Sequence, residues 1–289
     1  MEYIILLLDG PAIFKTIDNL LYGPTMPMNH RILRPLARPL LLDAVPGAAA
    51  AYSLRQLSNA YTGPVVTVRR SSDDAEEDFR ASEIDDGTLA AFCGAGDGLV
   101  KTWFDQSGNG RDGSQATLAD QPKIVSSGSL VTEGGKAALE FDGVGDTLEI
   151  GSIGISGSQD RSFFACLTPS VVTVSGWLAY GLAVTGKTYS LTTEYALRVQ
   201  GGNIVYGGAS AGRHDIISHI FTGSNVTDAV QYVNGVLLSV LSSTPLSINT
   251  DDSNCAIGSV GVVFQELIIY PSDQSANRER IEGDIAWYY

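Results

Sequence analysis

The sequence predicts a mostly β protein built from two packed antiparallel sheets, with an N-terminal arm before them and a short helix after them. Short apolar or alternating runs recur from Leu99 to the C-terminal region, with Gly, Asn, Ser or Asp between them. No helical pattern interrupts these runs. About a dozen strands without crossover helices indicate a sandwich of antiparallel sheets. Apolar residues make up 44% of the chain and charged residues 17%, so the composition is that of a globular protein.

Residues 1–46 differ from the rest and predict an anchoring arm, which leaves 47–289 as the sandwich domain. The run Tyr3–Leu8 reads as a buried strand. It lacks a basic region and a cleavage site, so it is not a signal peptide, and it is too short to span a bilayer. Pro11 opens a helix that Gly23 ends, and a segment rich in Pro and Arg follows. The residues predicted to anchor the arm are Phe14, Ile17, Leu21, Arg31, Arg34 and Arg38. The alternative is that the arm folds back on its own sandwich.

The next stretch, 47–98, begins with GAAAAYSLRQLSNA, which predicts a helix over 47–60, and PVVTVRR predicts a strand after it. Residues 73–86 hold eight acidic side chains. A solvated loop is the main interpretation of this acidic segment. A calcium site is the alternative, although the segment lacks the Asp-x-Asp-x-Asp-Gly order of a dedicated calcium loop.

Two local signals shape the C-terminal half. Asn234-Gly235 between two apolar runs predicts a two-residue hairpin. The ending PSDQSANRERIEGDIAWYY predicts a final helix capped by Ser272 or Ser275. The side chains of this helix predicted to face inward are Ile281, Ile285 and Trp287.

The charge and the cysteine content exclude several classes of function. A formal net charge of -14 repels phosphate backbones and anionic lipid, so we expect neither nucleic-acid binding nor membrane insertion. Cys93, Cys166 and Cys255 are far apart and predict three buried thiols. His214 and His219 are five residues apart in a predicted strand and should face opposite sides. We therefore predict no metal site and no cofactor.

The stretch TWFDQSGNGRDGSQAT contains the most site-like polar run of the chain. Its acidic and hydroxyl side chains can bond nearby amides in a turn, and its glycines permit positive φ. We interpret it as a structural turn signature and not as an active site. The signature comprises Trp103, Asp105, Gln106, Ser107, Gly108, Asn109 and Gly110.

Several segments together resemble a known family. The runs AAAAYSLRQLSNAYTGPVVTVRRSSDDAEEDF, WFDQSGNGRDGSQAT, QPKIV and ALEFDGVGDTLEI resemble the catalytic-domain family of α-L-arabinofuranosidase B, and its phage-encoded relatives most of all. The ending FQELIIYPSDQSANRERIEGDIAWYY is similar to the last strand and closing helix of concanavalin A-like, or laminin-G-like, jelly rolls. The resemblance covers roughly 41–289 and implies a concanavalin A-like antiparallel β-sandwich.

The resemblance also implies two catalytic carboxylates, and the matching positions here hold none. The family nucleophile is a Glu before an Asn-Asn pair; in the matching stretch Val199–Gly207, that position falls at Gly201 or Gly202. The family acid/base is an Asp after Ile-Gly-Gly, but here Ile257-Gly258 leads to Ser259 and Val260. The family's adjacent Cys-Cys pair is missing as well. The nearest other carboxylates are Glu194 and Asp215.

These features together lead to an expectation of a non-enzymatic phage virion protein, made in the host cytoplasm. Its main predicted role is a tail or fibre component that attaches to host-surface glycan, with residues 1–46 bound to other virion proteins. A capsid decoration or cement protein is the alternative, and an arabinofuranosidase-like glycoside hydrolase acting on host polysaccharide is the second. We expect a homo-oligomer, for which a trimer is plausible. The residues predicted to contact glycan are Trp177, Tyr195 and Tyr206, with core packing as the other role for each.

Overall fold

The structure, a computed structural model, describes residues 38–289. The predicted strand and helix of the arm, and its anchoring residues other than Arg38, lie outside the described residues. The compact unit that contains the sandwich starts at Pro39. Leu41, Leu42 and Val45 are buried in a hydrophobic cluster of this unit, which moves the predicted boundary from residue 46 to residue 38. The three apolar side chains explain the change, because the sandwich buries them.

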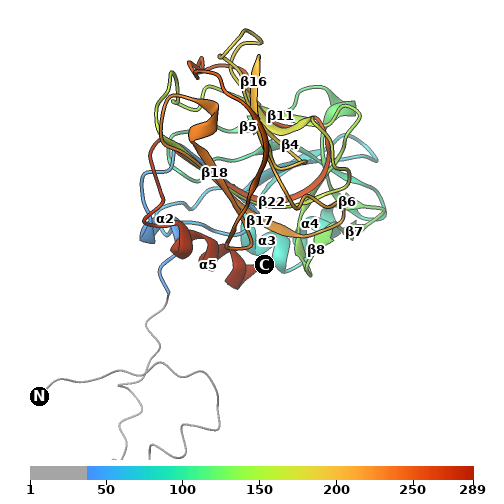
Figure 1. The fold of residues 1–289 in the computed structure, drawn as a ribbon. Coiled ribbons are helices and arrows are strands. Elements are labelled where there is room, and N and C mark those ends of the chain that lie inside the picture. The colour runs from blue at the N-terminus through green and yellow to red at the C-terminus, as the bar shows by residue number, and fades with distance from the viewer. Residues whose placement is uncertain (1–37) are drawn as a thin grey trace, which may run out of the picture. The chain divides into compact units, whose positions relative to one another are not determined.

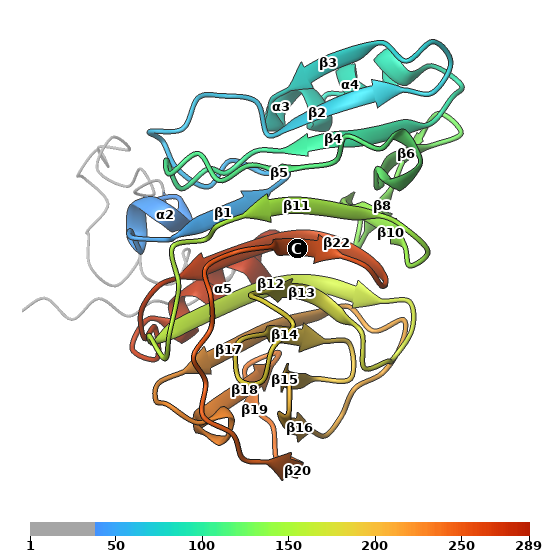
Figure 2. The same ribbon diagram turned by 90° about the horizontal axis from the view of Figure 1, so that it is seen from above.

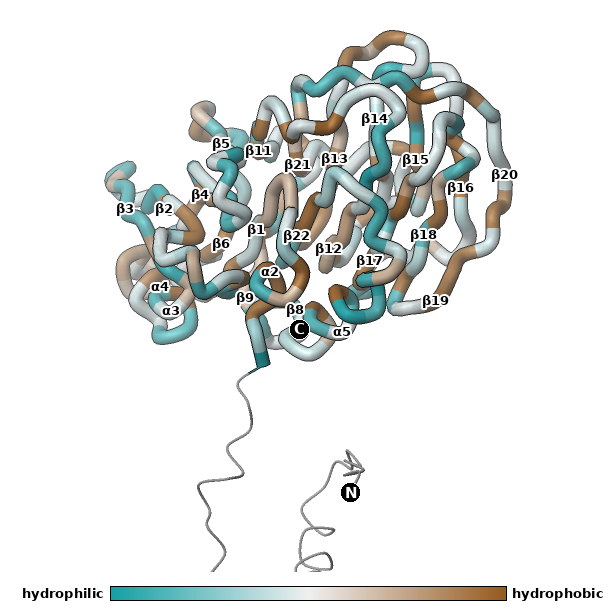
Figure 3. Tube along the Cα trace, turned by 90° about the vertical axis from the view of Figure 1, so that its left-hand side faces the viewer, coloured by the Kyte–Doolittle hydropathy of each residue, from teal (hydrophilic) through white to brown (hydrophobic). Residues whose placement is uncertain are grey.

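The strands form two layers, which Figure 3 shows from the side, while Figure 2 shows the succession of strands from above. We call the first layer the covered sheet. Its strands are β1 (Ala50–Ser53) and β10 (Leu139–Asp142), both next to β22 (Gly261–Tyr270), followed by β12 (Arg161–Pro169), β17 (Asp215–Phe221), β18 (Ala229–Val233) and β19 (Val236–Leu237). All of these pairings are antiparallel.

We call the second layer the open sheet. In spatial order its strands are β5 (Gly113–Ser114), β11 (Thr147–Gly151), β21 (Cys255–Gly258), β13 (Gly176–Tyr180), β14 (Tyr189–Thr192), β15 (Ala196–Val199), β16 (Gly202–Tyr206) and β20 (Val240–Thr244). The aromatic core, with Trp177, Phe163 and Phe264, lies between the two sheets.

A third group of strands joins the two sheets at one edge. It comprises β2 (Val66–Arg70), β3 (Glu76–Phe79), β4 (Gly98–Trp103), β6 (Lys123–Ser126) and β7 (Ser129–Leu130), while β8 (Thr132–Glu133) and β9 (Lys136–Ala137) form a separate pair. Strand β4 pairs with both β5 and β6, so the ladder continues around the edge. The prediction of a mostly β, antiparallel sandwich is confirmed.

The helical elements are short, and one of them covers a sheet. They are α2 (Leu41–Ala44), α3 (Ala81–Asp85), α4 (Thr88–Cys93), α5 (Arg278–Tyr288) and the 3-10 turns η1 (Leu118–Asp120) and η2 (Val226–Asp228). Figure 1 shows α5 beside β17. Ile281 and Ile285 of α5 pack on Phe164 of β12, as predicted for the two isoleucines. No helix within residues 38–289 is long and apolar enough to cross a membrane.

Three local predictions need correction. The stretch 47–60 contains strand β1 and not a helix, because Ala50 to Ser53 pair with β22 and are buried on both faces. Trp287 is 73% exposed, so it does not face inward. Asn277, which has no side-chain cap bond, occupies the N-cap of α5 in place of a serine. The hairpin prediction is confirmed, since Asn234 and Gly235 both have positive φ between β18 and β19.

Candidate functional site

The DQSGNG turn uses its side chains to hold the segment that contains β1. Asp105 Oδ1 accepts hydrogen bonds from the amides of Ala51 and Ser107, each at 2.8 Å. Gln106 Nε2 donates to the carbonyl oxygens of Ser53 and Arg55. Both side chains are nearly fully buried. These are the bonds of a structural turn, and they tie together parts of the chain about fifty residues apart.

The remaining members of the signature make the same kind of contact. Asn109 Nδ2 donates to the carbonyl oxygens of Ala48 and Ala49 at 3.0 Å, and Ser107 Oγ donates to Asp105 Oδ2 at 2.7 Å. Trp103 is fully buried in the core, and Gly108 and Gly110 have φ of 88° and 68°. The positive φ of these glycines is what the tight turn requires.

The three aromatic residues predicted to contact glycan are buried. Trp177, Tyr195 and Tyr206 expose 1%, 0% and 2% of their surface. Trp177 packs edge-on against Phe264 with ring centroids 5.6 Å apart, and Tyr206 donates its hydroxyl to the carbonyl oxygen of Ala229. Strand alternation directs Trp177 and Tyr206 toward the core, and Tyr195 is buried from the turn between β14 and β15, so none of them can stack on a sugar at the surface. The prediction of glycan contact by these residues is wrong.

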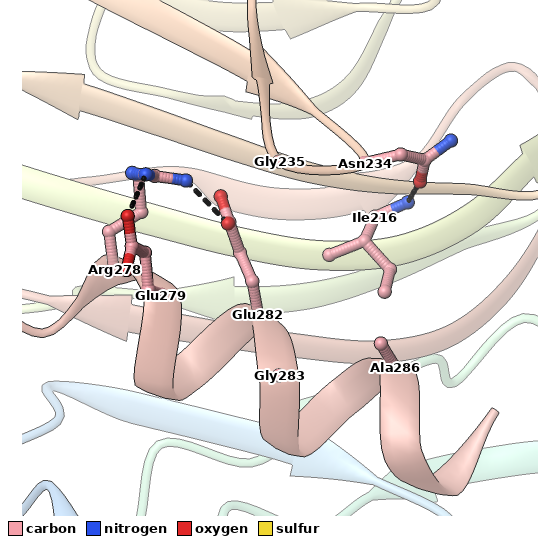
Figure 4. Close-up of a pocket in the computed structure, with 8 residues that line it drawn as sticks. All are labelled: Ile216, Asn234, Gly235, Arg278, Glu279, Glu282, Gly283 and Ala286. Carbon is pink, nitrogen blue, oxygen red and sulfur yellow. Dashed lines mark hydrogen bonds and ion pairs between the residues drawn. The ribbon is translucent and has the colours of Figure 1, made fainter.

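A cavity of about 470 Å³ lies between α5 and the turn that joins β18 to β19 (Figure 4). Its charged side chains satisfy one another. Arg278 pairs with Glu279 at 3.2 Å and with Glu282 at 2.5 Å, while Ser218 Oγ donates to the other oxygen of Glu282 at 2.7 Å. Glu282 thus has partners on both oxygens, and its carboxylate is fully engaged.

A smaller cavity of about 150 Å³ adjoins it and contains a cysteine–histidine pair. Cys166 Sγ lies 3.1 Å from His214 Nε2. Burial raises the pKa of the Cys166 thiol far above its usual range, so this pair does not generate a thiolate nucleophile. His219 lies in the inter-sheet core against Phe163, on the opposite side of β17, as predicted. Within residues 38–289 no three His, Cys, Asp or Glu side chains form a metal-binding group.

The acidic segment 73–86 forms ion pairs instead of a compact ligand set. Asp73 pairs with Arg70 at 2.7 Å, Asp74 with Arg69 at 2.6 Å, and Glu76 with Lys101 at 2.7 Å. Part of the segment forms β3 and α3. Its acids therefore spread over a strand, a turn and a helix, and not over one loop.

The two stretches that match the family's catalytic positions lie at opposite ends of the open sheet. Across β21, β13, β14 and β15, Ile257 is level with Leu197. From Ile257 the chain continues to Gly258 at one end of the sheet. From Leu197 it runs in the opposite direction and reaches Gly201 at the other end. Three strand spacings of about 4.8 Å and several residues of strand separate them. Gly201 and Ser259 therefore cannot flank one glycosidic bond, and their lack of carboxylates does not exclude activity.

Glu194 is the carboxylate that the structure places at the same end as Gly258. It lies in the turn between β14 and β15, and its side chain is 20% exposed. Arg198 lies four residues later, on the outer face of β15, and both Nε and Nη2 of its guanidinium donate to Glu194 Oε1. Within the described part of the chain, Oε2 of Glu194 makes no hydrogen bond. One oxygen is therefore held in place while the other is left for a ligand.

The turn that carries Glu194 is strained and firmly fixed. Tyr195 has φ of 59°, an uncommon backbone conformation for a residue with a side chain, and such residues cluster at functional sites. Its buried hydroxyl donates to Asp215 Oδ2. Asp215 also accepts bonds from Arg213 Nε and Asn234 Nδ2, each at 2.8 Å, and its side chain is fully buried. Asp215 is thus a support for the turn and cannot reach a substrate.

Two further carboxylates, Asp142 and Asp146, lie at this end of the open sheet near β11, several strands away from Glu194. Burial raises the pKa of Asp146 to about 6, whereas backbone hydrogen bonds, that of Val144 first, lower the pKa of Asp142. Asp146 precedes β11, whose Thr147 pairs with Gly258. Strand β14 is three strand spacings from β11, so roughly 14 Å or more separates Asp146 from Glu194. This exceeds the separation of about 5–9.5 Å at which two carboxylates cleave one glycosidic bond.

Sequence reasoning missed one part of this site. Arg198 carried a readable signal, because it lies four residues after Glu194 and at an alternate position of an apolar strand. Outside the site, the raised pKa of Asp146 had no signal in the sequence, since it depends on burial in the fold.

Comparisons with known proteins relate part of the chain to one family model and most of it to solved structures of the same fold. The model of the family described as "Alpha-L-arabinofuranosidase B, catalytic" matches residues 42–139, about a third of the chain. No curated protein matches. Among solved structures, an arabinofuranosidase complexed with arabinofuranosyl-alpha-1,2-xylobiose matches with a TM-score of 0.57 and 17% identity. A GH54 α-L-arabinofuranosidase soaked with a cyclic sulfate inhibitor matches with a TM-score of 0.60 and 17% identity. Each match covers 85% of this chain and 64% of the other.

These matches correct the functional prediction. A mutant GH54 α-L-arabinofuranosidase soaked with 4-nitrophenyl α-L-arabinofuranoside also matches, with a TM-score of 0.53, 18% identity and the same coverage. The expectation of a non-enzymatic virion protein, whether in the tail or on the capsid, is contradicted, because the family model and these structures all lead to arabinofuranosidases. The second alternative fits them better. Residues 42–139 thus match the α-L-arabinofuranosidase B catalytic family in sequence, and the chain shares the β-sandwich fold of the GH54 arabinofuranosidases.

Proposed function

We propose that this chain acts on arabinofuranosides as an arabinofuranosidase-like glycoside hydrolase, with Glu194 as the carboxylate that faces the anomeric carbon. The observation that supports this role is the geometry of Glu194, in which Arg198 holds Oε1 and leaves Oε2 without a partner among the described residues. An oriented, partly exposed carboxylate is what attack on an anomeric carbon, or activation of a water molecule, requires. The family match of residues 42–139 supports the substrate class.

A second candidate function is recognition of an arabinofuranoside without turnover. The spacing of the carboxylates favours it. Glycoside hydrolysis uses two carboxylates on either side of one bond, and Asp146 lies too far from Glu194 to be the second one. A carboxylate and a guanidinium can instead accept and donate hydrogen bonds to sugar hydroxyl groups.

Hydrolysis of 4-nitrophenyl α-L-arabinofuranoside by the full chain tests the first function. We expect the wild-type chain to release nitrophenol and Glu194→Gln to lose activity by about a thousandfold, because the amide can neither attack nor accept a proton. Glu149→Gln is the matched control, since Glu149 is an exposed carboxylate on β11 of the same sheet. We expect the control to keep wild-type kcat and KM.

Each outcome separates the two functions. Wild-type turnover that survives Glu194→Gln would remove Glu194 from the reaction. Saturable binding of the nitrophenyl glycoside without release of nitrophenol would favour recognition over hydrolysis. Neither binding nor turnover would reject the arabinofuranoside as the ligand class.

A further inference from the structure

A row of polar side chains crosses four neighbouring strands of the open sheet. Ser190 of β14 pairs with Arg198 of β15, and Arg198 pairs in turn with Asn203 of β16. Asn203 pairs with Thr244 of β20. The residues that alternate with this row along β14, β15 and β16 belong to the hydrophobic core. The row therefore lies on the outer face of the open sheet.

This row forms one wall of a pocket of about 400 Å³. Gln200 and Gly201, in the turn from β15 to β16, and Thr188, just before β14, complete its polar lining. The volume falls within the usual range for small-molecule sites, roughly 300–1,000 Å³. Among residues 38–289, no aromatic side chain and no carboxylate line it. The pocket thus differs from the rest of a chain whose net charge is -14.

The polar groups of this pocket have unused hydrogen-bonding capacity. Within residues 38–289, the side chains of Ser190, Gln200, Asn203 and Thr244 make no hydrogen bond to protein. Only the Thr188 hydroxyl is engaged, donating to the carbonyl oxygen of Leu182 at 2.8 Å. Amide side chains both donate and accept, and hydroxyl groups do the same. Such a set matches a ligand that carries several hydroxyl groups.

The charge of the pocket selects a neutral ligand over an anion. Arg198 is its one charged lining residue, and Glu194 neutralises the guanidinium through the contacts described above. A phosphate or carboxylate ligand would need an unpaired cation, which this lining does not supply. The geometry points to a saccharide-binding subsite here, for sugar rings of a neutral glycan beyond the ring that contacts Glu194.

The subsite shares one residue with the proposed reactive site. Arg198 contributes to both, because its guanidinium contacts Glu194 while its strand position belongs to the polar row. Ser190 lies two residues, roughly 7 Å, from Thr192 at the end of β14. A glycan chain lying along β14 and β15 would therefore place one ring at Glu194 and the next over the row. This inference rests on the proposed function for the position of the first ring.

Binding of a linear trisaccharide of α-L-arabinofuranosyl units tests the subsite. Titration calorimetry on the full chain carrying Glu194→Gln measures affinity without cleavage. We expect Asn203→Ala and Thr244→Ala, added singly, to weaken trisaccharide binding about fivefold each, as the loss of one hydrogen bond to the sugar implies. Ser243→Ala is the matched control, because Ser243 neighbours Thr244 on the same edge strand but points to the other face. The control should leave the affinity unchanged.

A second measurement distinguishes failure of the subsite from failure of the proposed function. In the chain with Glu194 intact, Ser243→Ala should leave kcat and KM for 4-nitrophenyl α-L-arabinofuranoside unchanged. Hydrolysis of this compound, which has a single sugar ring, tests the proposed reaction without the subsite. Trisaccharide affinity that is insensitive to both Asn203→Ala and Thr244→Ala would overturn the subsite even if hydrolysis is observed. Trisaccharide binding that depends on Asn203 in a chain without hydrolytic activity would support the subsite while rejecting the reaction.

Discussion

The two sheets of the sandwich have outer faces of opposite character. The outer face of the covered sheet packs against α2 and α5, and every residue of β12 is buried. The outer face of the open sheet carries the polar row, and every residue of its edge strand β20 is exposed. Figure 3 shows the helices on one side of the layers only. The fold thus uses one sheet for stability and leaves the other free to meet a ligand.

The charged groups on the two faces differ in the same way. On the covered face, Arg55 pairs with Glu266 at 2.8 Å and with Asp284 of α5 at 2.7 Å, all three at most 8% exposed. On the open face, Arg198 and Glu194 remain partly exposed and one carboxylate oxygen has no partner among the described residues. A buried pair needs both partners, whereas a partly exposed pair can exchange one contact for a ligand.

The largest effect should come from breaking the buried pair on the covered face. We expect Glu266→Leu to destabilise the chain by about 3–5 kcal/mol, because it leaves the Arg55 charge buried without its main partner. Urea denaturation of the variant measures this loss. The triple variant Arg55→Met/Glu266→Leu/Asp284→Leu should recover much of it, since apolar side chains then replace all three charges of the cluster. A triple variant no more stable than Glu266→Leu would show that the loss comes from packing.

An intermediate effect should appear at the end of the open sheet, and it depends on pH. Because burial raises the pKa of Asp146 from 3.8 to about 6, folding favours its protonated form. The contribution of protonated Asp146 to the free energy of unfolding is fully present below about pH 4 and is lost as the pH rises through 6. The difference in unfolding free energy between Asp146→Asn and wild type should therefore shift by about 2 kcal/mol in favour of the variant from pH 4 to pH 7.5. Parallel stability curves for the two proteins across this range would contradict the raised pKa.

The smallest effect should come from the exposed surface of the open sheet. Glu149→Gln alters a carboxylate on β11 that is exposed to solvent. We expect a change in unfolding free energy within about 0.5 kcal/mol, as is usual for surface substitutions. Thermal denaturation would measure it. A loss comparable to that of Glu266→Leu would mean that the outer face of the open sheet is covered as well.

The same contrast explains which parts of the fold were predictable. The alternating strands of the open sheet, such as Gly202–Tyr206, show inward and outward positions directly in the sequence. Strand β1 does not, because Ala50 to Ser53 are buried on both faces and alanine favours helices when sequence alone is considered. Only pairing with β22, more than two hundred residues later, makes this segment a strand. The prediction that Trp287 faces inward was wrong for a related reason, because the apolar character of a residue does not show on which side of α5 it lies.

The candidate site was predictable only in part. Glu194 was identified as a nearby carboxylate, but its importance became apparent from strand register, which shows that Gly201 and Ser259 lie at opposite ends. Register depends on pairings between distant segments, and a match of short motifs by eye contains no such information. Trp177 shows a related limit of the sequence. An aromatic residue of a β-sandwich can stack on a sugar ring or pack in the core, and only the structure shows that Trp177 is buried.

The three free cysteines form a built-in set of probes for local opening. Cys166 belongs to the layer under α5, Cys255 to the core between the two sheets, and Cys93, at the end of α4, to the part of that core next to β2 and β6. All three are buried, and burial raises the pKa of Cys93 to about 11 and those of the other two further. A thiol reagent can therefore modify each one only when its own layer opens. The order in which the three are labelled would report whether α5 detaches before the two sheets separate.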